Sequence, residues 1–512
     1  MIRLAPVRPR PFGWAALLLL SSLVGCAGPD VAGTFRSESP PPFSASGSAV
    51  TPDRWWTTFD DPGLNHQIET ALGDNFSLAA ALNRLAAARA LTRREASDLW
   101  PDIDGVAEIG GVFGPGSDPT SYTLGLDASY QVDLWGQIES RVEAERLRAA
   151  ATGADYHAIA LTLSAEIART WFSLIEARAQ LALVEEQIET NRNGVIAQEL
   201  KFGSGEVGGP DVLRQRQLVE STLEQSVVVK SRIDVLEHQL AVLRGQLPQQ
   251  ASFYTGAELP GLPPLPDTGL PSELLKRRPD VRRDYLAFMA ADRDLASAIS
   301  SRYPRLNLSA SVLSIADHPE TLLRDWFVGI GGQLIAPLFD GGQRRAEIDR
   351  TAAVVRQRFN EYGETMLNAF REVEDNLALE RYQLERLKHL EAQSEYARQA
   401  SDQLRRRYLF READYLDVLS ATTAEQRLQR ETLAARLDLL LIRVALYLAL
   451  AGDFETRPQE QFELQGLVVP EEASVEEEEN GGSEIESLPE PASELQQLLR
   501  SVEPFPARDA NE

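Results

Sequence analysis

One stretch, YTLGLDASYQVDL at residues 122–134, alternates apolar and polar side chains over its whole length. Alternation with a period of two predicts a β-strand with one apolar and one polar face. The polar face is expected to carry Asp127, Ser129, Gln131 and Asp133. Such a strand suits either a half-buried sheet in a soluble protein or a membrane barrel with a polar, water-filled interior.

A second hairpin is predicted further along the chain. Residues 306–312 alternate in the same way, and segments 103–113 and 326–336 are the expected pairing partners of the two alternating strands. Four strands cannot close a membrane barrel, whose known minimum is about eight. If the strands cross a membrane, the chain has to oligomerise, and a trimer would supply a 12-stranded barrel.

The chain also repeats itself. Tyr156 recurs as Tyr362 and Asp211 recurs as Asp417, each after 206 residues. This self-similarity predicts two copies of one unit. We place them at residues 53–250 and 268–455, joined by a proline-rich linker at 251–267.

Each unit is predicted to contain one very long helix. Residues 137–202 and 343–408 contain no proline and would each extend about 99 Å if helical throughout. Shorter helices are expected at 62–100 and 210–245, and two such helices stacked end to end would match one long helix. A plain soluble coiled coil explains the helices equally well, so only the strands favour a membrane protein.

The N-terminus predicts export. Arginines at positions 3, 8 and 10 precede an apolar run at 12–24 that is too short to span a bilayer, and Cys26, the only cysteine, lies two residues after this run. This layout resembles the lipobox of bacterial lipoproteins, which implies a signal peptide at 1–25 and a lipid on Cys26. Residues 26–52 are expected to form a flexible tether. Residues 456–512 form an acidic tail that we predict to be disordered.

Composition excludes several classes of function. A net charge of −26 argues against a nucleic-acid binder, and a single cysteine excludes an intrachain disulfide or a thiolate metal cluster. The five histidines lack metal-ligand spacing, and the chain has neither a phosphate loop nor a nucleophile elbow. We therefore expect no enzyme activity and no cofactor other than the covalent lipid. The sequence contains no stretch of about 20 apolar residues, so we predict no transmembrane helix.

Several short motifs together resemble one family. They are the lipobox, Trp55-Trp56 with Phe59, Asp133-Leu134-Trp135-Gly136, Arg278-Pro279-Asp280-Val281, Pro337-Leu338-Phe339 with Gly341-Gly342, and Asp417-Val418-Leu419. Over about residues 50–455 the chain is similar to the TolC-like outer-membrane factors, in the lipoprotein branch that serves RND efflux systems. The resemblance implies a mainly α-helical homotrimer with a transmembrane β-barrel and an α-helical periplasmic tunnel. It also implies a passive exit duct for drugs or other small molecules, an adaptor protein and an inner-membrane pump.

The same resemblance assigns roles to individual residues. Asp417 matches an acidic position of the family's periplasmic gate, and the repeat places Asp211 at the equivalent point. Gly205 and Arg411 match the turns that dock the adaptor, although the family usually carries glycine where this chain has Arg411. A protein-secretion channel and a non-channel coiled-coil lipoprotein remain alternatives to efflux.

Overall fold

The computed structural model describes residues 41–111, 120–250, 252–253, 256, 258–452, 454 and 456. Cys26, the signal peptide and nearly all of the acidic tail lie outside these residues. The first repeat contains η1 (Trp55–Phe59), α2 (Pro62–Asp74), α3 (Phe76–Ser97), β1 (Asp102–Gly111), β2 (Thr120–Val132), α4 (Gln137–Gly203) and α5 (Gly209–Leu243). The second contains α6 (Pro271–Arg277), α7 (Pro279–Ser300), β3 (Arg305–Ala316), β4 (Trp326–Ile335), α8 (Gln343–Leu409) and α9 (Tyr415–Leu450). Short 3₁₀ turns lie at Pro248–Gln250 and Pro319–Thr321.

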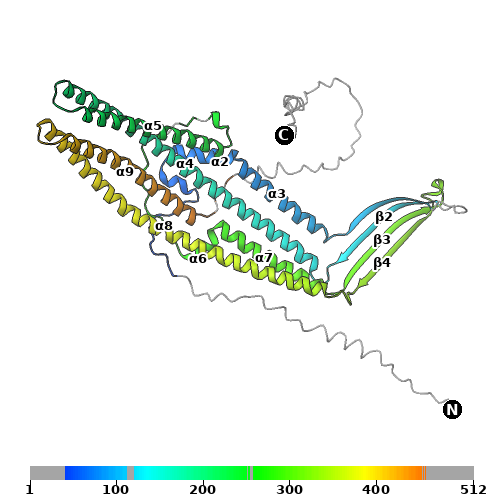
Figure 1. Cartoon of the computed structure of the whole chain (residues 1–512). Helices are drawn as coiled ribbons and strands as arrows, with labels where there is room; N and C mark the ends of the chain where they lie inside the picture. The colour runs from blue at the N-terminus through cyan, green and yellow to red at the C-terminus, as the bar shows by residue number, and fades with distance from the viewer. Residues whose placement is uncertain are drawn as a thin grey trace, which may run out of the picture. The chain divides into compact units, whose positions relative to one another are not determined.

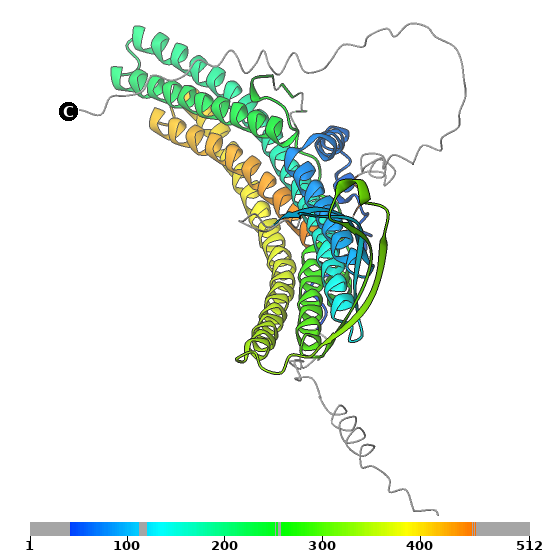
Figure 2. The ribbon, with the colours of Figure 1, turned by 90° about the vertical axis from the view of Figure 1, so that its right-hand side faces the viewer.

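The four strands form one antiparallel sheet in the order β1-β2-β3-β4. The sheet lies at one end of the helices, and the α4–α5 and α8–α9 turns lie at the other end (Figure 1). Figure 2 shows the strands curving as they leave the helical body. The predicted duplicated unit of long helices and strands is confirmed.

The two long helices are 67 residues each, which corresponds to about 100 Å. α4 is preceded by Gly136 and α8 by Gly342, both with positive φ. By length and composition, α4 contains one window apolar enough to cross a membrane, which differs from our expectation. Because 67% of that window is buried inside the protein, its apolar residues are accounted for as helix core.

The helix predicted at 62–100 is interrupted, and the reason is Asn75. Its backbone is extended, and its side-chain oxygen accepts a hydrogen bond from Leu78 N at 3.0 Å, capping α3. Its amide nitrogen donates to the carbonyl of Leu243 at 2.8 Å, at the end of α5. α5 and α3 therefore meet end to end beside α4, as expected.

Aromatic residues form the main core at the middle of the helical body. Trp55, Trp56 and Phe59 are buried, and the Trp55 ring stacks on Tyr447 of α9 with centroids 5.8 Å apart. Trp55 also donates its indole N–H to Ser164 of α4 at 3.1 Å. This cluster therefore joins the N-terminal segment to both repeats.

A buried ion pair fixes the linker to the second repeat. Arg443 of α9 pairs with both carboxylate oxygens of Glu380 on α8 at 2.6 and 2.8 Å, and the two side chains are only 2% and 7% exposed. The same guanidinium donates to the carbonyl of Pro264 at 2.8 Å and to that of Pro263. Because the buried Arg443 guanidinium is shielded from water, it needs hydrogen-bond acceptors within the protein. The two proline carbonyls supply some of them, and this holds the linker against α9.

The predicted flexible tether ends earlier than expected. Phe43 packs edge-on against Phe370 of α8, and Ser44 N donates to Glu374 Oε1 at 2.8 Å. Ala49 forms a parallel β-bridge with Pro266. The boundary at residue 52 is wrong, because the backbone and side chains between about 43 and 49 already bind the folded body.

Candidate functional site: the polar sheet face and the helical turns

The polar face of the sheet brings together residues from all four strands. On β2, Asp127, Ser129 and Gln131 alternate with apolar residues, and each has a polar partner directly opposite it on β3: Ser311, Ser309 and Asn307 respectively. On β1, Asp104 lies directly opposite Asp127. Two carboxylates at opposed positions repel each other across the strands, so this face is costly unless water or a donor reaches them.

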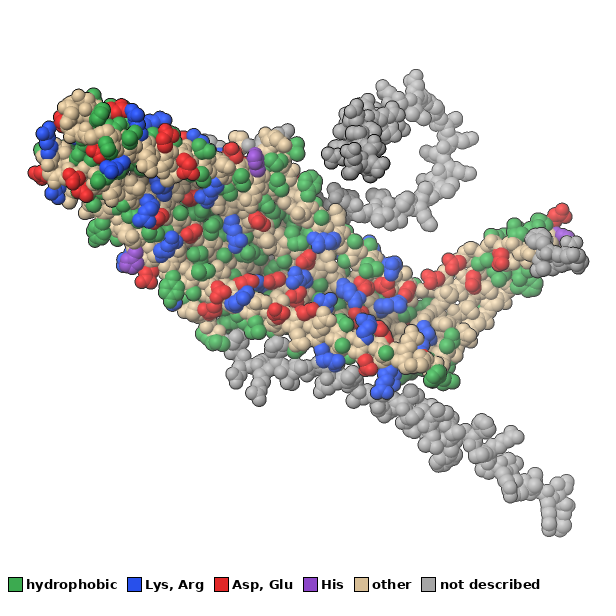
Figure 3. Space-filling view, viewed as in Figure 1, with side chains coloured by type: hydrophobic (Ala, Val, Ile, Leu, Met, Phe, Trp, Pro, Cys, Tyr) green, Lys and Arg blue, Asp and Glu red, His purple; other side chains and the backbone are tan. Residues whose placement is uncertain are grey.

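The other face of the sheet is apolar and exposed. Its members include Ile103, Leu126, Val312, Val328 and Ile330, with exposed fractions of 72% for Val328 and 87% for Ile330. Basic and acidic side chains crowd the helical body beside the sheet, whereas the face of the sheet in this view shows mainly uncharged side chains and backbone, with a few acidic side chains along its upper part (Figure 3). A contiguous apolar face of this kind marks contact with a membrane or another protein.

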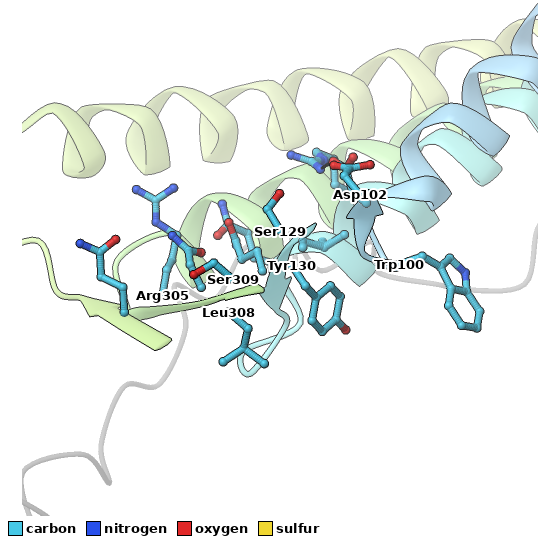
Figure 4. Close-up of a pocket in the computed structure, with 14 residues that line it drawn as sticks. Trp100, Asp102, Ser129, Tyr130, Arg305, Leu308 and Ser309 are labelled. Carbon is cyan, nitrogen blue, oxygen red and sulfur yellow. Dashed lines mark hydrogen bonds and ion pairs between the residues drawn. The ribbon is translucent and has the colours of Figure 1, made fainter. Parts of the chain in front are cut away.

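A pocket of about 450 Å³ lies at the base of the sheet, where the strands join the helices. Ser129 and Ser309 line its strand side, and Arg141 of α4 and Asp98 line its helical side. Arg141 forms ion pairs with Asp98 and, at 3.0 Å, with Glu95. In Figure 4 the side chains of Tyr130 and Leu308 point to the opposite side of the sheet from those of Ser129 and Ser309, as alternation requires.

Asp133 does not belong to the strand, so that part of the prediction is wrong. β2 ends at Val132, and the Asp133 carboxylate accepts hydrogen bonds from Gln137 N at 2.7 Å and Glu139 N at 2.8 Å. It therefore satisfies free amides at the start of α4. Asp340 does the same for α8, where hydrogen bonds from Gly342 N and from Arg344 lower the pKa of its carboxyl group.

The two helical turns have matching geometry. Gly205 has φ of 75° and Arg411 has φ of 62°. In each turn the next amide bonds back to the helix, from Glu206 N to Lys201 O and from Glu412 N to Arg407 O, both at 2.9 Å. This is the left-handed helix ending that favours glycine. Arg411 adopts it despite its side chain.

The Arg411 side chain also joins the two turns. Its Nη2 lies 3.2 Å from Glu206 Oε2, although the two side chains are 80% and 43% exposed. A pair this exposed contributes at most about 1 kcal/mol. It nevertheless connects the end of α8 to the end of α4.

The two acidic positions lie in the first turns of the returning helices. Asp417 follows the start of α9 and is exposed, and it makes no ion pair within the described ranges. Asp211 is half-buried at the start of α5 and pairs with Arg214 at 3.3 Å. Both carboxylates are stabilised by their helix N-termini. A gate role for either one stays a prediction.

Sequence analysis missed a row of buried polar side chains on α4. We name it the α4 polar seam, and it consists of Glu176, Gln180, Gln187, Asn191 and Gln198. Asn191 exchanges amide hydrogen bonds with Gln426 of α9 at 3.0 and 3.3 Å. The members of the seam are spaced by four and seven residues, which places them on one face of the helix. This spacing is visible in the sequence and could have predicted the seam.

A cavity of about 350 Å³ continues this row toward the turns, between the α4–α5 and α8–α9 hairpins. Tyr408 donates its hydroxyl to Gln198 at 3.2 Å, and Tyr415 donates to Gln215. Burial, with the nearby Tyr408 and Asp211, raises the pKa of Tyr415, so its hydroxyl stays protonated as a donor. The hairpins are therefore joined here by neutral hydrogen bonds.

The geometry can be compared with known proteins. A family model described as outer membrane efflux protein matches residues 67–246 and 270–452. The chain belongs to the outer membrane efflux protein family. The resemblance stated from the motifs, the outer-membrane location and the efflux-channel function are thereby confirmed. Members of this family form trimers and act with an adaptor and an inner-membrane pump.

The relatives share most of their length with this chain. It is 29% identical over 439 residues to the pyoverdine export outer membrane protein OpmQ of Pseudomonas aeruginosa, covering 81% of this chain and 91% of that protein. It is 27% identical over 420 residues to the cation efflux system protein CusC of Escherichia coli, covering 78% and 88%. The solved outer-membrane channel OprN has a TM-score of 0.76 at 27% identity, covering 84% of this chain and all of OprN.

Proposed function

We propose that three copies of this chain form the outer-membrane exit duct of a tripartite efflux pump. The observation that carries the proposal is a four-stranded sheet with two open edges, β1 and β4, and one exposed apolar face. In a bilayer, every backbone amide and carbonyl needs a partner within the protein, so open edges must close into a barrel. Three copies supply twelve strands.

The polar face then lines the barrel. Asp127, Ser129 and Gln131 face water in the lumen, while Leu126 and Val328 face lipid, which matches the alternation of known outer-membrane barrels. The long helices continue the duct into the periplasm. Because α4 and α8 each extend about 100 Å, the duct can carry substrates from deep in the periplasm to the cell exterior.

The adaptor docks at the turns opposite the sheet. Gly205 and Arg411 lie there, and the neighbouring Phe202 and Phe410 expose 54% and 78% of their surface in one chain. Exposed aromatic side chains beside well-formed turns are suited to binding a partner protein. Docking at this end connects the duct to the pump. Asp417, the proposed acidic gate of the duct, lies beside the α8–α9 turn.

A lipid on Cys26 can reach the membrane. Phe43 is fixed against Phe370, which lies about 40 Å along α8 from the sheet end of that helix. The chain from Cys26 to Phe43 can extend at most about 60 Å. Its length therefore permits the acyl chains to enter the leaflet at the base of the barrel.

The substrates are small molecules or ions rather than proteins. This choice is supported by the printed names of relatives, which export pyoverdine and cations and, in Pseudomonas putida, toluene. Short acidic, hydroxyl and amide side chains make up the middle of the polar face, on regular strands. Such a surface makes few selective contacts, which agrees with a passive duct whose pump does the selecting.

The test combines mass and conductance. The protein, purified in detergent, should sediment as a trimer and form stable conducting channels in planar bilayers. A monomer without conductance would refute the duct. Separately, mass spectrometry of the mature N-terminus should find a diacylated Cys26, and Cys26→Ser should leave an unprocessed precursor; an unmodified N-terminus elsewhere would refute the lipid anchor alone.

A further inference from the structure

Charged residues recur every seven positions on one face of α4, at Arg141, Arg148 and Asp155. Seven residues fall only about 20° short of two full helical turns and advance the helix by about 10 Å. The three residues therefore lie in a row that extends about 21 Å along the helix. We name this row, together with its ion-pair partners on α3 and α7, the charge ladder.

Each position of the charge ladder forms an ion pair with a neighbouring helix. The pairs are Arg141 with Glu95 and Asp98, Arg148 with Asp294, and Asp155 with Arg283. The side chains of Arg141 and Arg148 are each 41% exposed, and that of Arg283 is 39% exposed. Ion pairs this exposed contribute little to stability. Their charges are, however, within reach of a solute beside the wall.

The charge ladder lies on the side of the helices that continues the polar face of the sheet. α3 and α7 flank α4, and α8 packs against α7, so these four helices lie side by side in one layer with two open sides (Figure 1). Arg141 lines the pocket at the base of the sheet together with Ser129 and Ser309 of the polar face. Because the polar face lines the lumen in the proposed trimer, the charge ladder faces the tunnel.

We propose that Arg141, Arg148 and Arg283 line the tunnel and offset the negative charge of its wall, so that anionic solutes pass this part of the duct. The inference rests on the proposed trimeric duct and adds residues that set its charge selectivity. Fixed charges of one sign in a channel attract ions of the opposite sign and exclude ions of the same sign. Without the arginines, the carboxylates of the charge ladder would face the lumen in three copies and exclude anions.

The other open side of α4 supplies a matched control. Arg146 also pairs with a carboxylate, that of Glu143, at 2.7 Å, and its side chain is 67% exposed. It follows Arg141 by five residues, which places it about 140° around the helix. Arg146 therefore faces the outside of the tunnel. Replacing it with glutamine removes the same charge as replacing Arg141, but not from the lumen.

A cysteine reporter measures the local potential in the full-length protein. Ser129→Cys places a thiol in the pocket that Arg141 lines, and Cys26, the only natural cysteine, is expected to be acylated. The measured quantity is the ratio of the reporter's reaction rates with a cationic trimethylammonium methanethiosulfonate and an anionic sulfonate one. Arg141→Gln should raise this ratio about twofold at 0.1 M salt, and less at 1 M, where the Debye length falls to about 3 Å. Arg146→Gln and Arg141→Lys should leave the ratio unchanged, and an equal rise in Arg146→Gln, or no rise in Arg141→Gln, would overturn the proposal.

Planar bilayers test the consequence for transport. In a salt gradient, Arg148→Gln should shift the reversal potential toward cation selectivity, and Asp294→Asn should shift it toward anion selectivity. Arg146→Gln should leave it unchanged. Asp294→Asn decides by its sign if Arg148→Gln does not assemble. Conducting channels in which Arg148→Gln and Asp294→Asn match Arg146→Gln would overturn the proposal and leave the duct standing; a monomeric parent protein without conductance would instead refute the duct.

Discussion

Replacing Arg411 with glycine should stabilise the turn between α8 and α9. Arg411 has φ of 62°, a left-handed conformation that costs a residue with a Cβ about 1–2 kcal/mol. Its ion pair with Glu206 is worth at most about 1 kcal/mol, since both side chains are largely exposed. The strain is the larger of the two quantities. Arg411→Gly should therefore raise the free energy of local opening of this turn by a net of about 1 kcal/mol.

The equivalent turn of the first repeat supplies the control. Gly205 has φ of 75° and the same backbone hydrogen bonds, and a Cβ added there would meet no neighbouring atom within 4 Å. Gly205→Ala should therefore report backbone strain alone, and it should weaken its turn by about 1 kcal/mol. Glu206→Gln removes the ion pair without changing either backbone.

Hydrogen exchange followed by mass spectrometry measures both turns separately in the trimer. An effect of about 1 kcal/mol corresponds to about a fivefold change in exchange, slower near residue 411 in Arg411→Gly and faster near residue 205 in Gly205→Ala. If Arg411→Gly exchanges faster and Glu206→Gln exchanges faster by the same factor, the ion pair outweighs the strain and the reasoning is wrong. Unchanged exchange in Gly205→Ala would show that the left-handed geometry carries no cost here.

Three further sets of substitutions should separate the roles of the sheet, the buried ion pair and the acidic turn. Leu126→Arg should destabilise the barrel by about 2–4 kcal/mol, whereas Ser129→Arg, on the polar face, should alter single-channel conductance at nearly unchanged thermal stability. Glu380→Ala leaves a buried guanidinium without its carboxylate and should cost about 3–5 kcal/mol, measured by denaturant unfolding of the purified protein. Asp417→Ala should abolish block by divalent cations in planar bilayers, with Asp211→Ala doing so less, because the substitution removes the carboxylate that would bind the cation. Unchanged block in Asp417→Ala would place the gate elsewhere.

Periodicity explains why much of the fold could be predicted. The absence of proline predicted α4 and α8 to within one residue at their ends, and alternation predicted β2 within two. The break at Asn75 was not predicted, because asparagine can also lie within a helix and its capping role depends on Leu243, far away in sequence. Local pattern therefore predicts elements better than the contacts that interrupt them.

The site was predicted less completely, for a related reason. Asp133 continues the alternation of β2, so the pattern places it on the strand, yet its carboxylate is used to cap α4. Residues 43–49 are rich in small and polar side chains, which is typical of a tether, but their backbone amides find partners on the linker and α8. In both cases a hydrogen-bond partner outside the local segment decides the structure.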